Sequence, residues 1–245
     1  MNEPSIYRVA RILHALGKNM NRLEAYYQSL KVQPLLLNEL HPRFFPSINT
    51  YRATDSTLID FRFVKPLERE SICTTFLAET KGPSPRSIVV KFVHRYNEEA
   101  HNLLAASNMA PKLLYCGKVG VRDDDPSYGH LQMVVMDYID GITVDRAPTL
   151  PSSFREQVQA ILTLLHKYDF VFGDIRGPNL MLTKDAKVVL IDCDWIGKHG
   201  VSQYPIMMSQ SITWPEGVKD GLVVMKKEHD FEMLGQLLQK LVFVH

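Results

Sequence analysis

The stretch that decides the fold is VFGDIRGPNLML, residues 171–182, followed by LIDCDWIG, residues 190–197. Asp174 and Asn179 stand five residues apart, and Gly177-Pro178 between them excludes a continuous helix. NLML (179–182) and KVVLI (187–191) are short apolar runs joined by the turn sequence TKDA, so they predict a β-hairpin. The hairpin returns the chain to Asp192 and brings this residue to the same end as Asn179.

These polar residues predict a particular chemistry. An amide oxygen and a carboxylate are hard oxygen ligands, and together they suit Mg²⁺ with a phosphate completing the coordination shell. Asp174 precedes the hairpin and could orient or deprotonate a hydroxyl in line with that phosphate. The competing interpretation is structural, because Asp and Asn are commonly turn formers that satisfy loop backbone.

Working outward from the hairpin, the apolar periodicity predicts the remaining elements. We expect helices at about residues 5–30, 95–110, 151–168 and 228–242, and strands at 57–64, 71–79, 87–93, 112–119 and 131–139. Ser153 and Glu156 form a capping-box pattern at the start of the third helix. The order of strands with one helix, then mostly helix, predicts an α+β protein with two lobes.

The bulk composition excludes several classes of protein. The chain has 245 residues, a formal net charge of +1 and three widely separated cysteines (Cys73, Cys116 and Cys193). The near-neutral charge gives no sign of nucleic-acid binding or of attraction to a membrane, and the cysteines suggest no disulfide framework. We expect an intracellular protein without a signal peptide or membrane span. A cytoplasmic location is the default, and a nuclear one would follow only from the family resemblance given below. The oligomeric state is not predicted.

Several motifs carry a resemblance to a known family. GDIRGPN (173–179) resembles the catalytic loop of the protein kinase-like superfamily, and IDCDWIG (191–197) resembles its metal-binding segment, including that of choline- and aminoglycoside-type kinases. With VVKFVHRYNEEAHNLL (89–104), MAPKLLYCG (109–117) and VVMDYIDG (134–141), residues 50–240 are most similar to fungal kinase-like domains of the Crinkler-associated type.

The resemblance implies a bilobal protein kinase-like fold and three regions. Residues 1–50 would be an N-terminal helical extension, 51–139 a β-rich N-lobe, and 140–245 a short, mainly helical C-lobe.

The resemblance also implies how ATP would be bound. Lys91 would contact the ATP phosphates and pair with Glu99 or its neighbour Glu98. The hinge around Met136 and Tyr138 would lie against adenine.

In the catalytic loop, Asp174 would be the catalytic carboxylate, and Asn179 and Asp192 would be the Mg²⁺ ligands. Arg176 would stabilise the phosphoryl group in transfer. Asp230 would hold the backbone of the catalytic loop.

The implied activity is that of an ATP- and Mg²⁺-dependent phosphotransferase that acts on protein Ser/Thr hydroxyls, with a small-molecule acceptor as an alternative. VKPLERESICTTF (64–76) has no glycine where a phosphate-covering loop would carry several. This departure keeps two other readings open: a catalytically weak pseudokinase that acts as a binding module, and transfer of AMP in place of phosphate.

Overall fold

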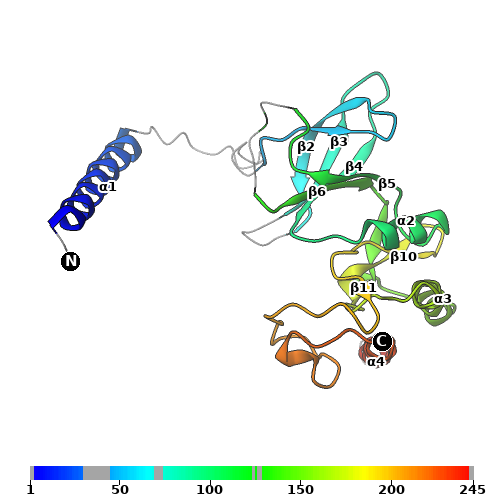
Figure 1. Cartoon of the computed structure of the whole chain (residues 1–245). Coiled ribbons are helices and arrows are strands. Elements are labelled where there is room, and N and C mark those ends of the chain that lie inside the picture. The colour runs from blue at the N-terminus through cyan, green and yellow to red at the C-terminus, as the bar shows by residue number, and fades with distance from the viewer. Residues whose placement is uncertain (1–2, 30–44, 69–73, 123–124, 126–128, 243–245) are drawn as a thin grey trace. The chain divides into compact units, whose positions relative to one another are not determined.

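The structure is a computed structural model that describes residues 3–29, 45–68, 74–122, 125 and 129–242. The chain divides into two compact units, residues 1–44 and 45–245. The described part of the first unit is one helix, α1 (Glu3–Ser29), as the apolar periodicity predicted. The second unit holds the remaining elements (Figure 1).

An antiparallel sheet forms one end of the second unit (Figure 1). The strands run in the order β1-β2-β3-β4-β6-β5, and their bounds are β1 (Thr50–Arg52), β2 (Leu58–Pro66), β3 (Thr75–Thr80), β4 (Ser87–Val93), β5 (Leu113–Lys118) and β6 (Gln132–Asp137). Each predicted strand is thereby confirmed, although the start of the one expected at 71–79 lies outside the described residues.

The central strand β4 determines which side chains reach the two faces of the sheet. Its sequence SIVVKFV places Ile88, Val90 and Phe92 in a core with aromatic residues of β2 and β3. Because alternate residues of a strand point to opposite faces, Lys91 and Val93 lie on the other face. Lys91 is therefore a charged residue on a buried strand, and it needs a counter-charge within reach.

Helices and a small sheet make up the rest of this unit. The helices are α2 (Glu98–Ala106), α3 (Phe154–Lys167) and α4 (Lys227–Val242), with short 3₁₀ helices η2 (Val144–Arg146), η3 (Gly177–Asn179) and η4 (Val218–Asp220). Strands β9 (Leu180–Thr183) and β10 (Val188–Leu190) form the predicted hairpin, β7 (Gly141–Thr143) pairs with β9, and β8 (Phe170–Val171) pairs with β11 (Gly197–Lys198). Residues of α2, α3, α4, η2, η4, β8, β9 and β10 share one hydrophobic core.

The start of α3 differs from the predicted capping box. Ser153 precedes the helix, but its side chain makes no capping hydrogen bond. Its backbone angles, φ −85° and ψ 10°, are close to helical and not to the extended values that a capping side chain needs. The hydroxyl accepts a hydrogen bond from the side chain of Gln157 at 3.0 Å.

A carboxylate from α4 holds the loop that precedes η3. Asp230 is fully buried and accepts hydrogen bonds from the backbone N–H groups of Phe172 at 2.9 Å and Gly173 at 2.8 Å, and from His166 at 2.8 Å. The expected contact between Asp230 and the loop backbone is confirmed. Gly173 has φ +77°, a backbone conformation in which a residue with a side chain is strained, so the loop favours glycine at this position.

The described part of the chain thus has a mixed α and β architecture. No helix in it combines the length and the apolar content needed to cross a bilayer.

We expect Asp230→Ala to lower the free energy of unfolding by about 3 kcal/mol, since it leaves buried N–H donors without an acceptor. Urea denaturation measures this change. Asp185→Ala is the matched control, because Asp185 is exposed in the turn between β9 and β10. Equal stability of the two variants would contradict the role of Asp230 in holding the loop.

Candidate catalytic site

The β9–β10 hairpin brings Asn179 and Asp192 to the same end, as its length predicted. Leu180 pairs with Leu190, and the N–H of Ile191 donates to the carbonyl of Asn179 at 3.1 Å. Asp192 follows directly. Asn179 and Asp192 lie just beyond the paired ends of β9 and β10, so the pairing along the hairpin holds them near each other.

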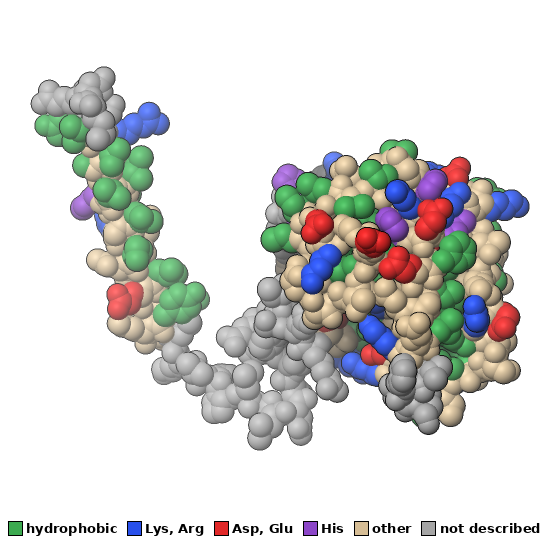
Figure 2. Space-filling model, turned by 90° about the horizontal axis from the view of Figure 1, so that it is seen from below, with side chains coloured by type: hydrophobic (Ala, Val, Ile, Leu, Met, Phe, Trp, Pro, Cys, Tyr) green, Lys and Arg blue, Asp and Glu red, His purple; other side chains and the backbone are tan. Residues whose placement is uncertain are grey.

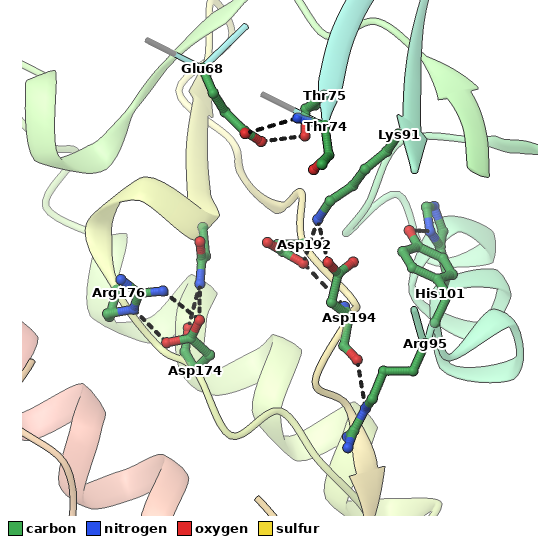
Figure 3. Close-up of polar contacts among 12 residues, drawn as sticks. Glu68, Thr74, Thr75, Lys91, Arg95, His101, Asp174, Arg176, Asp192 and Asp194 are labelled. Carbon is green, nitrogen blue, oxygen red and sulfur yellow. Dashed lines mark hydrogen bonds and ion pairs between the residues drawn. The ribbon is translucent and has the colours of Figure 1, made fainter. Parts of the chain in front are cut away.

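Asp174 is the centre of a polar group with Arg176 and Asn179, in which Asp174 and Asn179 are buried. Figure 3 shows Arg176 against the Asp174 carboxylate. Its carboxylate accepts hydrogen bonds from Arg176 Nε and, at 2.6 Å, from Arg176 Nη2. Asn179 Nδ2 donates to Asp174 Oδ2 and to the Asp174 carbonyl, both at 2.8 Å. Burial raises the pKa of Asp174 above its ordinary value, although Arg176 opposes this shift.

Lys91 is the centre of a second polar group, on the other side of Asp192 from Asp174 (Figure 3). Its ammonium lies 3.0 Å from Asp192 Oδ1 and 2.8 Å from Asp194 Oδ2, with only 9% of its side chain exposed. Burial by itself would lower the pKa of Lys91, but the two carboxylates more than offset it and hold the pKa above its ordinary value. The sheet and the hairpin are therefore joined through one buried cation.

The expected pairing of Lys91 with Glu99 is not formed. Glu99 Oε1 lies 3.8 Å from Lys198 Nζ, and 72% of the Glu99 side chain is exposed. The neighbouring Glu98 is also exposed. The reason is the short connection after β4: α2 begins at Glu98 with Asn97 as its cap, so both glutamates stand in the first turn, beside the solvent.

Asp194 is a residue of the candidate site that the sequence analysis did not predict. It supplies the second carboxylate on Lys91, and its N–H donates to Asp192 Oδ1 at 3.1 Å. Its other oxygen, Oδ1, is buried and accepts no hydrogen bond within the described residues. Burial and the nearby Asp192 raise the pKa of Asp194 above its ordinary value. The alternation Asp-Cys-Asp at 192–194 was the signal that could have found it.

The segment after Asp192 is held by side chains from the β4–α2 connection. Arg95 donates to the carbonyls of Asp194 at 3.0 Å and Trp195 at 2.9 Å, and Asn97 Nδ2 donates to the carbonyl of Ile196 at 3.0 Å. These bonds fix the backbone that carries Asp194. They join positions about a hundred residues apart, so local sequence patterns gave no sign of them.

The expected adenine-binding residues lie at the end of β6. Met136 is buried against Val93 and Val134, and its cross-strand partner Val89 shares its face of the sheet with Lys91. Tyr138 follows the strand and is 36% exposed. Most of the glycine-free turn between β2 and β3, residues 69–73, lies outside the described residues.

The donor set fits Mg²⁺ together with phosphate oxygens. Asp192 and Asp194 offer carboxylates, and Asp194 Oδ1 has no hydrogen-bond partner among the described residues. The two side-chain hydrogen bonds of Asn179 both use its amide nitrogen, which leaves Oδ1 for a cation. Within the described ranges, no three His, Cys, Asp or Glu side chains form a metal site by themselves. Mg²⁺ is commonly held by one or two carboxylates with substrate phosphates completing its shell.

Comparison with known proteins places part of the chain near one family. Residues 125–206, about a third of the chain, match the model of the family described as lipopolysaccharide core biosynthesis protein (WaaY). The matched region contains Asp174, Asn179, Asp192 and Asp194. No curated protein matches the chain significantly.

This match corrects the resemblance drawn from sequence. The similarity to fungal Crinkler-associated domains is wrong, because the family that matches is WaaY. The motifs that carried the resemblance supply Mg²⁺ and phosphate chemistry, so different families of the same chemistry share them. The match supports a kinase-like transferase in general and gives no support to a protein Ser/Thr acceptor.

The two ends of the Lys91 contact should respond differently to substitution. Lys91→Met leaves the partly buried carboxyl groups of Asp192 and Asp194 without their counter-charge, so we expect it to lower the free energy of unfolding by about 2 kcal/mol. Asp194→Asn removes one of two carboxylates that share a single ammonium. It should therefore not lower that free energy.

Chemical denaturation of both variants in Mg²⁺-free buffer tests this contrast, with Glu99→Gln as the control that should match wild type. A loss in Asp194→Asn as large as that in Lys91→Met would contradict it.

Proposed function

We propose that the protein is a Mg²⁺- and ATP-dependent phosphotransferase whose second unit has a bilobal kinase-like fold and whose acceptor is a carbohydrate hydroxyl. One observation supports the chemistry above all others. A buried lysine on the sheet contacts two carboxylates that follow the hairpin, beside a buried aspartate that belongs to a separate polar group.

In this proposal the two polar groups have separate tasks. When bound, ATP supplies the phosphoryl group and Mg²⁺ neutralises part of the negative charge on the phosphates. Asp192, Asp194 and the Asn179 amide oxygen would ligate the cation, and Lys91 would move its ammonium from the carboxylates toward the α- and β-phosphates. Met136 and Tyr138 would border the adenine.

Asp174 would accept a hydrogen bond from the acceptor hydroxyl and orient its oxygen for attack. Its raised pKa suits this role, because a base works best when its pKa approaches the working pH. Arg176 lies on the Asp174 carboxylate and would fix its orientation. Arg176 also remains a candidate for stabilising the phosphoryl group in transfer.

The acceptor class rests on the family match. The matched region contains the proposed catalytic and metal-binding residues, and the matched family takes part in assembling a saccharide, the lipopolysaccharide core. A sugar hydroxyl is an alcohol, so Asp174 could orient it as it would a serine. The chemistry is therefore the same for both acceptors, and only the acceptor differs from the one first expected.

Asp174→Asn should reduce phosphoryl transfer by about 10²- to 10⁴-fold, because the amide cannot accept the proton of the hydroxyl. Nucleotide affinity, measured by calorimetry with Mg·ATP, should stay within a factor of about two of wild type. Asp185→Asn is the control and should leave both quantities unchanged. Transfer at the wild-type rate in Asp174→Asn would contradict the assignment.

The acceptor and the transferred group can be tested in one assay. We expect label from γ-labelled ATP, and none from α-labelled ATP, to appear on a phosphate-free lipopolysaccharide core oligosaccharide but not on a generic protein substrate. Transfer to the protein alone would contradict the carbohydrate acceptor, and label from the α position would mean AMP transfer. No label from either, with no thermal stabilisation by Mg·ATP, would identify a binding module instead.

A further inference from the structure

Four consecutive backbone carbonyls of the candidate site accept hydrogen bonds from two residues. The acceptors run from Cys193 to Ile196, the segment that carries Asp194. The donors are Arg95 and Asn97, in the short connection between β4 and α2. The N–H of Asn97 donates to the carbonyl of Cys193 at 3.3 Å, and its side chain donates to that of Ile196 at 3.0 Å. Arg95 holds the two carbonyls between them.

Arg95 uses every nitrogen of its guanidinium group on main-chain oxygens. Nε donates to the carbonyl of Asp194 at 3.0 Å, Nη2 to that of Trp195 at 2.9 Å, and Nη1 to that of Gln203 at 3.4 Å. A guanidinium presents its donors in one rigid plane, so it fixes the relative positions of the groups that it binds. Because these acceptors are main-chain atoms, the hydrogen bonds of Arg95 leave the Asp194 carboxylate available to a ligand.

Asp194 is therefore held from two sides. Its carboxylate Oδ2 lies 2.8 Å from the ammonium of Lys91, and its carbonyl accepts a hydrogen bond from Arg95. Figure 3 shows Lys91 and Arg95 on opposite sides of Asp194. The two cations stand four residues apart in the chain, so one short segment supplies both contacts.

The two contacts have different fates in the proposed reaction. There Lys91 moves its ammonium from the carboxylates toward the phosphates of ATP, and its contact with Asp194 is lost. The contact between Arg95 and the Asp194 carbonyl uses no atom that the reaction needs, so it persists. At that stage the main-chain hydrogen bonds keep the Asp194 carboxylate beside Asp192.

The charge of the protein as a whole does not supply affinity for a cation. The formal net charge is +1, and Figure 2 shows Lys and Arg side chains interspersed with Asp and Glu on one face of the second unit. Such a surface does not concentrate cations near the protein. Affinity for Mg²⁺ must therefore come from the placement of its ligands, and residues that orient metal ligands are typically worth about 10- to 100-fold in affinity.

The effect of Arg95 on the site can be separated from its effect on the fold. Arg95 is exposed to solvent, so its contacts contribute little to the stability of the whole molecule. Asn97 differs in this respect, because its side chain also caps α2 by accepting from the N–H of Ala100 at 3.0 Å. Arg95 is therefore the better position for a test.

We propose that Arg95 is a positioning residue for the bound cation. Through the carbonyls of Asp194 and Trp195 it holds the Asp194 carboxylate in place for Mg²⁺ after Lys91 has moved to the phosphates. The inference rests on the proposed function, because it requires ATP and Mg²⁺ to bind at this site. Loss of Arg95 should weaken the part of ATP binding that depends on Mg²⁺ and leave the remainder intact.

Calorimetry with ATP on the full-length protein, once in excess Mg²⁺ and once in EDTA, tests the proposal. The ratio of the two dissociation constants measures how much Mg²⁺ strengthens ATP binding. Arg95→Met removes the three donors and keeps a long side chain, and we expect it to reduce this ratio by about 10-fold. Its ATP affinity in EDTA and its thermal unfolding midpoint should match those of wild type.

Two further variants separate geometry from charge and position. Arg95→Lys keeps the charge but donates from a single nitrogen, so it should show most of the loss seen in Arg95→Met. Arg155→Met makes the same substitution at an exposed arginine of α3 and should match wild type.

Several results would overturn the proposal. An unchanged ratio in Arg95→Met would show that Arg95 does not act on the cation, and an equal loss of affinity in both buffers would show that it supports the whole nucleotide site. Wild-type behaviour of Arg95→Lys would show that its charge matters and its hydrogen-bond geometry does not. A wild type that binds ATP equally in both buffers would contradict a cation at this site. A wild type that binds ATP in neither buffer would overturn the proposed function itself, and this inference with it.

Discussion

The contact on which the candidate site depends is the buried ammonium of Lys91 between the carboxylates of Asp192 and Asp194. Lys91 belongs to the central strand of the six-stranded sheet, and the two carboxylates follow the β9–β10 hairpin. A buried charge cannot be left unpaired without a large loss of stability, so this requirement keeps the sheet and the hairpin in contact. Two carboxyl groups share one ammonium there, and their proximity helps to raise the pKa of Asp194. A divalent cation would relieve the repulsion between them and stabilise both in the ionised form.

Two further sets of hydrogen bonds hold the backbone that carries these residues. Asp230 accepts hydrogen bonds from the loop that leads to Asp174, and Arg95 donates to the carbonyls of the segment that contains Asp194. Both act on main-chain atoms, so they fix the backbone without hydrogen bonding to the carboxylates of Asp174, Asp192 or Asp194. In this way α4 and the β4–α2 connection supply rigidity around the candidate site.

The family match supports the type of chemistry that the motifs indicated, but not the family that they indicated. The motifs around Asp174 and Asp192 contain the groups that Mg²⁺ and phosphate chemistry requires, and they correctly indicated a kinase-like transferase. They indicated the wrong family, because the residue types needed to hold a cation and orient a hydroxyl are the same whatever molecule carries that hydroxyl. The match to the WaaY model covers this same region, and it directs attention from protein hydroxyls to those of a saccharide.

The sequence by itself determined the four α-helices, the strands β2 to β6 and the hairpin that brings Asn179 to Asp192. Apolar periodicity and turn residues are local, and the length of an antiparallel hairpin fixes which residues meet at its end. Only the tertiary structure decided the partner of Lys91. The choice between Glu99 and Asp194 depended on where α2 begins after β4 and on how the sheet packs against the hairpin, and both are set by contacts between residues far apart in the chain. The hydrogen bonds of Arg95 and the burial of Asp194 Oδ1 could not be predicted from sequence either. The charge of a side chain can be read from sequence, but its neighbours and its access to water are properties of the folded molecule.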